Sequence, residues 1–528
     1  MKCKKILASL LSLGLVFSPM SIFAEDTAVA QSADGTSQYN DYDSAWSAAN
    51  NGVEIVMLQD WNLSSRLIVN ESATVTIDMN GHKMDRNLSD SVSDGEVIYL
   101  KKKSNLTLKG STDSTFTVKN LWKDKDGGTT TQETIGGLVT GGYSSNGGGG
   151  IHMKEGSQLT LDHVGVMGNS ATTYSRNGGG IHTDGDGCII NLNNESSVSY
   201  NYASNKGGGI YVDDEDNYIY MDNSEISYNR ANEGGGIASN DDATRITMNN
   251  LSKINNNRAT EAGGAIYFGD SYSLVQSPDS TGSINNNVAA KDGVGGAIYY
   301  PYVYTSNHQA EIKNIDFTNN QAQSYDEVKY NSDGDEIQNY SRGGAIYSNI
   351  KNLTITNCAF TGNTAEIGGA IYQNATNMTL DNCTITNNKS TDKGAGVYVN
   401  SSADINLTGD ITIKDNTNND SASDIYLDSG SSRAYVSGTP NAGSKVGLLG
   451  IGEGKVAINQ SENNGCFFLD ESDRYHLEYS GSEIYEKSGA TGSIFGNGNT
   501  VVALCVMGGI VVVGAVVLVV NKKKKANA

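Results

Sequence analysis

Apolar and polar residues alternate over short stretches through most of the chain. Residues 159–161 read Leu-Thr-Leu and residues 353–355 read Leu-Thr-Ile, for example. Between residues 148 and 427, no stretch repeats apolar residues at the roughly 3.6-residue period of a helix. A period of two predicts short strands with one buried and one exposed face. The pattern therefore predicts an all-β chain.

Two linked motifs recur through residues 148–427. The first is Gly-Gly-Gly/Ala followed by Ile or Val, and successive copies lie 25–32 residues apart except for one step of 48. The Ile/Val positions are 151, 181, 210, 237, 266, 298, 346, 371 and 397, with a degenerate copy at 425. The second motif, apolar-x-x-Asn, ends at Asn169, Asn201, Asn229, Asn257, Asn287, Asn320, Asn363, Asn388 and Asn416. Two motifs that keep step indicate a repeat array.

One repeat has room for two or three short strands, which is too little to bury a face alone. Stacked repeats with strands about 4.8 Å apart would place the Ile and Val residues in a continuous interior column. Glycine allows positive φ and close backbone approach at one corner. Asn tolerates the left-handed conformation and forms local hydrogen bonds, which suits the other corner. We therefore predict a right-handed parallel β-helix.

The motif pair resembles the repeat of chlamydial polymorphic outer-membrane proteins, which are adhesins. More broadly, it resembles the right-handed β-helix surface proteins of the pectate-lyase-like class. The match is closest at Phe317 to Asn320 with residues 343–346, and at Phe360 to Asn363 with residues 368–371. Elsewhere Ile or Val replaces Phe, and Gly replaces Ala. The resemblance covers about residues 145–427 and implies a surface protein. No autotransporter barrel fits after residue 427, so the chlamydial export route is not implied.

Both ends of the chain have the pattern of targeting segments. Three lysines precede the apolar residues 6–17, so residues 1–24 are expected to be a signal peptide. Residues 501–520 are uncharged and long enough for one transmembrane helix, although a buried core helix is the alternative. The lysines of the cytoplasmic tail, residues 521–528, should stay inside. We expect a single-pass cell-membrane protein with its bulk outside, on a cell that looks Gram-positive.

The regions beside the repeat are expected to cover its ends, since a solenoid exposes strand edges. Residues 25–147 would form an N-terminal cap and the first coils, with a short capping helix at 43–49 and a loop at 121–147. Residues 428–487 would form a C-terminal β cap, with β patterns at 444–458 and 466–485. Residues 488–500 would be a spacer before the membrane.

Composition narrows the class of protein further. The 528 residues include 62 Gly and only 4 Pro, and Gly has no three-residue period, which excludes collagen. An apolar fraction of 37% argues against wholesale disorder. The formal charge is −22, and seven lysines lie in the two terminal segments, which leaves −29 for the rest. Nucleic acid is therefore excluded as a partner.

Acidic residues follow the Ile of successive repeats at similar offsets, so they should line one edge of the solenoid. They are Asp184, Asp186, Asp213, Asp214, Asp216, Asp241, Asp242 and Asp270. This edge is either a row of solvated turns or a Ca²⁺ site, because Ca²⁺ takes several carboxylate oxygens. No other cofactor is expected. An enzyme would need a basic or aromatic residue next to these carboxylates, and only Arg245 lies near this edge. A polysaccharide lyase or glycoside hydrolase is therefore the alternative function and not the main prediction.

Tyrosines follow the inward Ile or Val of many repeats and should point outward. The candidates for binding are Tyr267, Tyr299, Tyr347, Tyr372 and Tyr398, and Tyr211 and Tyr426 occupy the same slot. They form either a stabilising ladder or a flat strip for a sugar or a protein. The long step, residues 321–342, adds a candidate binding loop with Tyr325, Tyr330 and Tyr340.

Cys358 and Cys383 lie 25 residues apart and should stack one coil apart. That separation allows either a disulfide or a buried reduced pair. Together, the features predict a non-catalytic surface protein that binds a host protein, a neighbouring-cell surface protein or a polysaccharide. A stalk without a ligand is the structural alternative.

Overall fold

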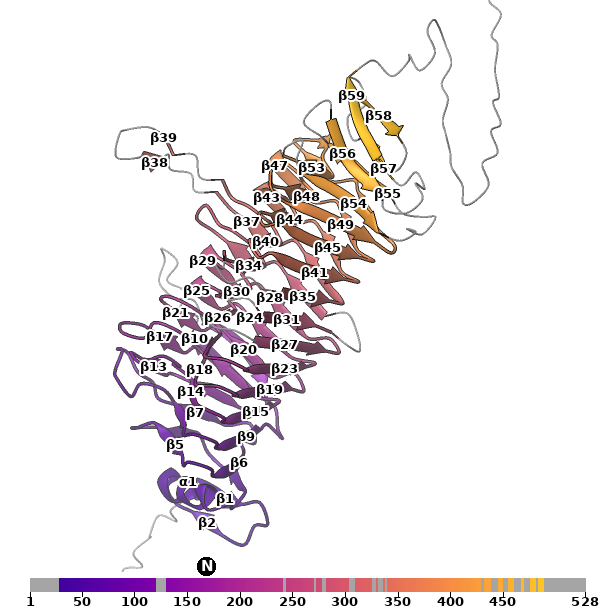
Figure 1. The fold of residues 1–528 in the computed structure, drawn as a ribbon. Helices are drawn as coiled ribbons and strands as arrows, with labels where there is room; N and C mark the ends of the chain where they lie inside the picture. Colours follow the sequence, from indigo (N-terminus) through magenta and orange to yellow (C-terminus); the bar gives the residue numbers. More distant parts are fainter. Residues whose placement is uncertain are drawn as a thin grey trace, which may run out of the picture.

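The chain forms one long stack of coils (Figure 1). The computed structural model describes residues 28–119, 130–240, 244–269, 272–277, 282–302, 309–324, 329–330, 336–337, 340–428, 432–437, 445–449, 454–459, 467–469, 475–480 and 483–488. Consecutive coils pair in parallel and in register, so that Ile151 lies beside Ile181 and Ile181 beside Ile210. The predicted parallel β-helix is confirmed, with about 11 turns. Its right-handed sense stays a prediction.

One coil contains four short strands, where two or three were predicted. In one example these are β18 (Ile181–Asp184), β19 (Ile189–Asn193), β20 (Ser197–Ser199) and β21 (Tyr202–Ala203). The fourth strand is only two residues long and belongs to a separate 11-stranded sheet that runs from β13 (Tyr143–Ser144) to β52 (Ser421–Ala422). The extra strand arises because the segment between the Asn and Gly corners also pairs with its neighbours.

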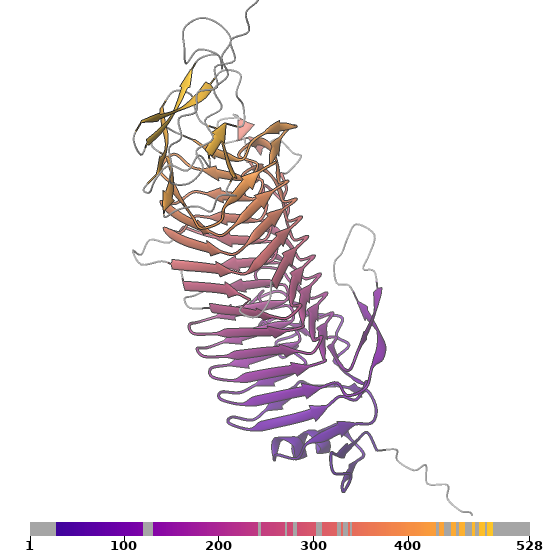
Figure 2. The same ribbon diagram turned by 90° about the vertical axis from the view of Figure 1, so that its right-hand side faces the viewer.

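Three columns of longer strands form the other walls of the stack. The β19 column contains β6 (Thr74–Asp78), β9 (Asn105–Lys109), β15 (Gln158–Asp162), β23 (Tyr218–Asp222), β27 (Thr244–Asn249), β31 (Tyr272–Gln276), β35 (Gln309–Lys313), β41 (Asn352–Thr356), β45 (Asn377–Asp381), β49 (Asp404–Thr408) and β54 (Arg433–Ser437). We call its outer surface face A (Figure 2). The β18 column contains β5 (Leu67–Val69), β8 (Ile98–Leu100), β14 (Ile151–Lys154), β22 (Ile210–Asp213), β26 (Ile237–Ser239), β30 (Ile266–Phe268), β34 (Ile298–Tyr300), β40 (Ile346–Ser348), β44 (Ile371–Gln373), β48 (Val397–Val399) and β53 (Ile425–Leu427). The β20 column contains β4 (Trp61–Asn62), β7 (Lys83–Asp85), β12 (Leu138–Thr140), β16 (Gly165–Met167), β24 (Glu225–Ser227), β28 (Lys253–Asn255), β32 (Gly282–Asn285), β36 (Ile315–Thr318), β42 (Ala359–Thr361), β46 (Thr384–Thr386) and β50 (Thr412–Lys414).

The interior is the predicted column of apolar side chains. Ile181, Ile210 and Ile237 are fully buried, and so are the alternate residues of the face A strands, such as Leu380. Burial of each such side chain contributes about 1.5–3 kcal/mol. Alternation sends the intervening polar residues outward, which explains why the period-two pattern located the strands.

The glycine corner forms as predicted. Gly343 has φ +66°, which an L side chain rarely adopts. A Cβ on Gly344 would overlap the carbonyl oxygen of Gly369 in the next coil. The first glycine of the motif is therefore needed for its backbone angle, and the second for close approach.

The asparagine corner differs from the prediction. The left-handed residue is the one before the motif Asn, such as Asn286 before Asn287, with φ 55°. Asn287 is buried, and its side chain bonds to Asn257 and Ile254 of the preceding coil and to Asn320 of the following coil. The resulting asparagine ladder runs from Asn169 to Asn416, whose Nδ2 donates to Asp424 Oδ1 at 2.7 Å. The motif is therefore a hydrogen-bonding device between coils.

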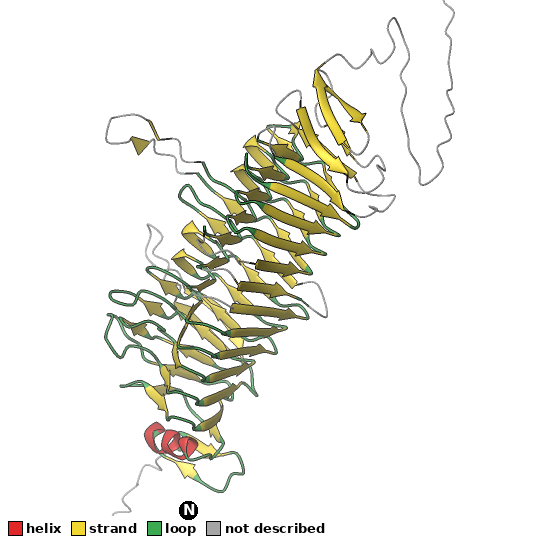
Figure 3. Cartoon of the chain, viewed as in Figure 1, coloured by secondary structure: helices red, strands yellow, loops and turns green. Residues whose placement is uncertain are grey.

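A helix forms at the predicted position and lies at the N-terminal end of the stack (Figure 3). Helix α1 (Tyr42–Asn50) begins after Asp41, whose carboxylate accepts from Ser44 N at 2.7 Å. Trp46 is buried, and its Nε1 donates to Ile68 O at 2.9 Å. Strands β1 (Ala30–Ser32), β2 (Gln38–Tyr39) and β3 (Ile55–Met57) join the same end.

The loop prediction for residues 121–147 is wrong for the part that the structure describes. Strand β11 (Thr130–Ile135) pairs antiparallel with β10 (Ser114–Lys119) in a hairpin beside the stack (Figure 2). Phe116, Val118 and Ile135 of this hairpin pack on Met167 of the solenoid wall. These apolar positions hold the hairpin against the coils, a tertiary contact that the Gly/Thr/Ser-rich composition conceals.

The C-terminal strands depart from regular stacking. β55 (Lys445–Leu449), β56 (Gly454–Asn459), β57 (Phe467–Leu469), β58 (Tyr475–Ser480) and β59 (Glu483–Ser488) follow the last repeat. β59 pairs antiparallel with β56 and β58. The side chains from residue 450 onward lie outside the described residues, so the C-terminal β cap stays a prediction.

The predicted targeting segments lie outside the described residues. These are the signal peptide at 1–24, the spacer at 488–500 beyond Ser488, the helix at 501–520 and the tail at 521–528. In the part of the chain that the structure does describe, no helix has the length and apolarity needed to cross a membrane.

Candidate functional site

The tyrosines of the β18 column form a ladder of rings that is continuous from Tyr267 to Tyr426. Neighbouring rings from Tyr267 to Tyr426 stack with centroids 4.8–5.7 Å apart. Ala238 interrupts the series, and on its N-terminal side His152 and His182 stack at 4.8 Å next to Tyr211. Within each of the two runs, an interior ring thus contacts the rings of the coils before and after it.

The ring ladder is largely covered. Tyr372 and Tyr398 are buried, and burial raises the pKa of Tyr372 to about 12. Lys206 Nζ lies 4.5 Å from the centroid of the Tyr267 ring, and the Arg342 guanidinium lies 5.7 Å from that of Tyr372. Stacking occupies the ring faces, so a ligand can reach only ring edges and hydroxyls. The arrangement fits a stabilising role.

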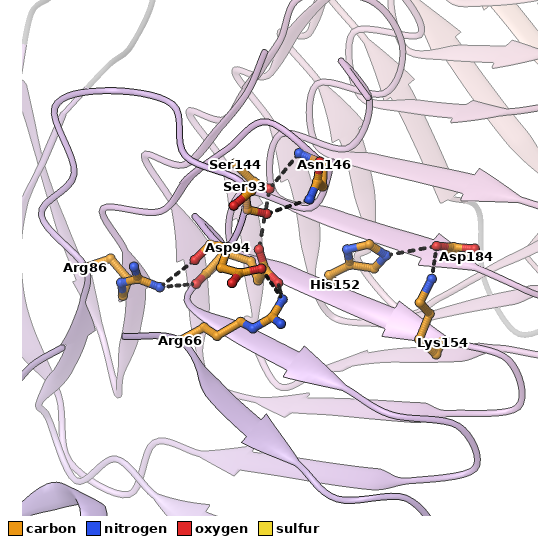
Figure 4. A network of polar contacts seen from close by, with 10 residues as sticks. Arg66, Arg86, Ser93, Asp94, Ser144, Asn146, His152, Lys154 and Asp184 are labelled. Atoms are coloured by element: carbon orange, nitrogen blue, oxygen red, sulfur yellow. Dashed lines mark hydrogen bonds and ion pairs between the residues drawn. The ribbon is translucent and has the colours of Figure 1, made fainter. Parts of the chain in front are cut away.

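A buried histidine lies within the ladder (Figure 4). His152 Nε2 is 3.3 Å from Asp184 Oδ2, and Lys154 forms an ion pair with the same carboxylate. These two partners, His152 first, hold the pKa of Asp184 well below its usual range. His182 is buried, and neither of its ring nitrogens has a hydrogen-bond partner among the described residues. Burial, and then the neighbouring His152, lowers the pKa of His182 well below 6.5.

The described part of the acidic edge consists of the last residues of two strands, Asp184 and Asp213, and of the turn residues that follow them. Asp184 lies beside Asp213 in the parallel register. Asp214 and Asp216 have φ values of 67° and 55°, a left-handed conformation that Asp tolerates. Asp186 Oδ1 accepts from the backbone N–H of Glu215 at 3.0 Å. Asp241, Asp242 and Asp270 lie outside the described residues. Among the residues that are described, no three His, Cys, Asp or Glu side chains converge to hold a metal.

A second charged network lies in the first coils (Figure 4). The buried carboxylate of Glu96 pairs with Arg66, which also lies 3.1 Å from Asp94. Arg86 donates to the carbonyl oxygens of Asp94 and Glu96 at 3.0 and 2.8 Å. These contacts tie the loop before β8 to the stack, which is a structural role.

Cys358 and Cys383 are free cysteines in the structure, and the choice between a disulfide and a reduced pair stays a prediction. Cys358 and Cys383 are buried, and Cys383 Sγ donates to Ile355 O at 3.4 Å. Burial raises the pKa of Cys383 to about 12 and that of Cys358 further. Thiols in this state are poor nucleophiles.

Two short described strands of the insertion, β38 (Lys329–Tyr330) and β39 (Glu336–Ile337), lie away from the stack (Figure 1). They form a small hairpin, while β34 pairs directly with β40. Tyr340 packs against the buried cluster of Ile367 and Tyr372. Tyr325 and the side chain of Tyr330 lie outside the described residues.

Face A carries an aromatic pair that the sequence reasoning missed. The rings of Tyr218 and Tyr220 on β23 lie 6.0 Å apart and nearly parallel, and Tyr220 is 39% exposed. Arg245 on the next strand donates to Tyr218 Oη at 3.1 Å. The signal was available, because Tyr-x-Tyr on a strand that alternates with Ile and Met must place both rings on one outer face.

A polar groove continues face A towards the C-terminus. It has a volume of about 400 Å³, and its lining includes Glu311, Thr354, Thr379 and Asn406 together with Gln309, Asn352 and Asn377. Apart from Ala310 and Leu353, the lining residues carry amides, hydroxyls and one carboxylate, that of Glu311, which pairs with Lys313 at 2.6 Å. Such groups bind hydroxyl-rich ligands by hydrogen bonding.

The fold and the motif pair define a class: parallel β-helix proteins with stacked glycine and asparagine corners. The family model of the Chlamydia polymorphic membrane protein repeat matches residues 252–269, 314–349 and 357–374. These segments are therefore similar to the repeat of this family, and the resemblance is confirmed. No curated protein and no solved structure matches the chain. The repeat family and the solenoid fit a surface β-helix protein.

Proposed function

We propose that the chain is a non-catalytic adhesin of the cell surface that binds its ligand along face A. The ligand is a polysaccharide, or a protein of a host or a neighbouring cell. The observation that carries the proposal is the groove on face A, which begins three strands beyond the Tyr218–Tyr220 pair. Among the described residues of these strands, outward side chains such as those of Tyr220 and Arg245 are exposed, unlike the buried rings of the tyrosine ladder.

The composition of the groove supports binding without catalysis. Hydrolysis of a glycosidic bond uses two carboxylates about 5–9.5 Å apart. The groove lining includes one carboxylate, and Lys313 already pairs with it. A polysaccharide lyase or glycoside hydrolase remains the alternative function, and it predicts the release of product from a bound polysaccharide.

An array of polysaccharides and surface proteins, probed with the purified chain, tests the proposal. Binding without release of product is the expected result, and the Ala variant of Tyr220 should weaken it. The same array with millimolar Ca²⁺ tests the acidic edge, since a Ca²⁺ site would change binding or the melting temperature. Product release would establish the enzyme instead, and no binding anywhere would favour a stalk.

We also propose that the solenoid lies outside the cell. A signal peptide at 1–24 and one transmembrane helix at 501–520 would present the solenoid outside a Gram-positive cell. Protease treatment of intact cells should then remove the solenoid and leave the C-terminal segment with the membrane.

A further inference from the structure

We infer that the ligand of face A is an uncharged, linear polysaccharide that lies along the solenoid axis. The inference rests on the proposed function and names the chemical class of its ligand. It depends on three properties of one row of side chains: their alignment, their spacing and their chemistry.

The row is continuous from the aromatic pair to the groove. Strand register places Tyr218 beside Arg245, and Arg245 is linked through the backbone of Leu274 to Glu311. Glu311 then lies beside Thr354, Thr354 beside Thr379, and Thr379 beside Asn406. We call this row, Tyr218, Arg245, Glu311, Thr354, Thr379 and Asn406, the axial strip.

The spacing of the axial strip suits a polymer with a repeating unit. Adjacent parallel strands lie about 4.8 Å apart, so six steps from β23 to β49 span about 29 Å. Each strand of this span except β31, where the row passes through Leu274, contributes one member of the strip, so similar contacts recur along the axis. A linear glycan repeats its hydroxyls at a spacing close to that of the strands, whereas a folded protein does not present a periodic row.

The chemistry of the axial strip matches sugar hydroxyls. Thr354 and Thr379 each offer a donor and an acceptor, and the Asn406 amide offers both as well. The partly exposed ring of Tyr220, beside Tyr218, provides an apolar face for the C–H side of a pyranose at one end. The strip lacks the apolar centre of a protein interface.

Charge distinguishes the class of glycan. Arg245 and Glu311 are the two charged members of the strip, and they cancel formally, although the chain carries −22. A polyanion needs a row of cations, and a basic ligand needs a surplus of carboxylates. The strip provides neither, so an uncharged glycan fits best.

Calorimetry with the purified full-length chain tests the inference. The probes are linear hexasaccharides of glucose, mannose, xylose and N-acetylglucosamine, with the corresponding trisaccharides and with charged galacturonate and heparin oligomers. Thr379→Arg places a long cation in the strip, and Thr384→Arg is the matched control. Thr384 is an exposed outward residue on β46 of the same coil but lies off face A.

The expected result is that at least one uncharged hexasaccharide binds, and binds about tenfold more tightly than its trisaccharide, which is about 1.4 kcal/mol. T379R should weaken binding at least tenfold, and T384R should leave it unchanged. Equal effects of the two variants, a preference for charged oligomers, or no binding of uncharged ones would overturn the inference. If a surface protein binds face A while these glycans do not, the inference fails and the proposed function stands. If no array ligand binds, both fail.

Discussion

The asparagine ladder should make a large contribution to stability, and Asn287→Ala measures it. Asn287 is buried, and its Oδ1 accepts from Asn257 N at 2.9 Å and from Asn257 Nδ2 at 3.2 Å. Its Nδ2 donates to Ile254 O and to Asn320 Oδ1, both at 3.0 Å. Alanine removes all four bonds.

The expected cost follows from the groups left without partners. The N–H of Asn257 and the carbonyl of Ile254 are backbone groups in the buried corner, and each unsatisfied group costs about 1–3 kcal/mol. Asn287→Ala should therefore destabilise the chain by about 4 kcal/mol. The adjacent Asn286 is exposed and left-handed, so Asn286→Ala should cost only about 1 kcal/mol, and Asn286→Gly close to nothing.

Urea unfolding followed by circular dichroism gives the difference in stability, and hydrogen exchange locates it. The Asn257 amide should exchange faster in the Asn287 variant, because its acceptor is gone. If Asn287→Ala costs no more than Asn286→Ala, or if exchange at Asn257 is unchanged, the motif Asn does not hold the coils together and the reasoning is refuted.

Three further predictions concern other parts of the stack. Gly344→Ala should destabilise the solenoid by about 1–3 kcal/mol, because the new Cβ would overlap the Gly369 carbonyl. The urea midpoint should fall, and an unchanged midpoint would contradict the prediction. The pKa of His182 is lower in the folded chain than the value of 6.5 expected in the unfolded chain. The unfolded chain therefore binds the proton more readily, and the free energy of unfolding falls as the pH drops below about 6.5. Tyr occupies this position in other coils, so His182→Tyr should reduce the decrease in melting temperature between pH 7 and pH 5. An equal decrease in the variant and in the unmodified chain would contradict the lowered pKa of His182. Cys358 and Cys383 should resist a thiol reagent until the chain unfolds; fast labelling of the native chain would show that the thiols are accessible.

Much of the fold is local enough to read from the residues. The period-two strands and the Ile of each motif are buried as predicted, because a strand alternates its faces whatever its partner. The first motif glycine has positive φ, as at Gly343, because that requirement belongs to a single residue. Asn287 was misread for the opposite reason: its bonds go to residues 30 and 33 positions away, in the coils on either side.

The candidate sites were harder to predict than the fold. The tyrosines align as expected, yet Tyr372 is buried, because Arg342 and Ile367 from another corner lie over it. The Asp184 carboxylate sits next to a lysine and a histidine that come from the preceding coil, Lys154 and His152.

The parallel β-helix, the glycine corner and the inward columns follow from the residues alone, because each depends on a residue's own backbone angle or on strand alternation. The tertiary structure alone decided which outward residues stay open. Stacking joins residues that lie tens of positions apart, so the hairpin against Met167, the cover over the ring ladder and the open axial strip on face A arise only when the coils lie side by side.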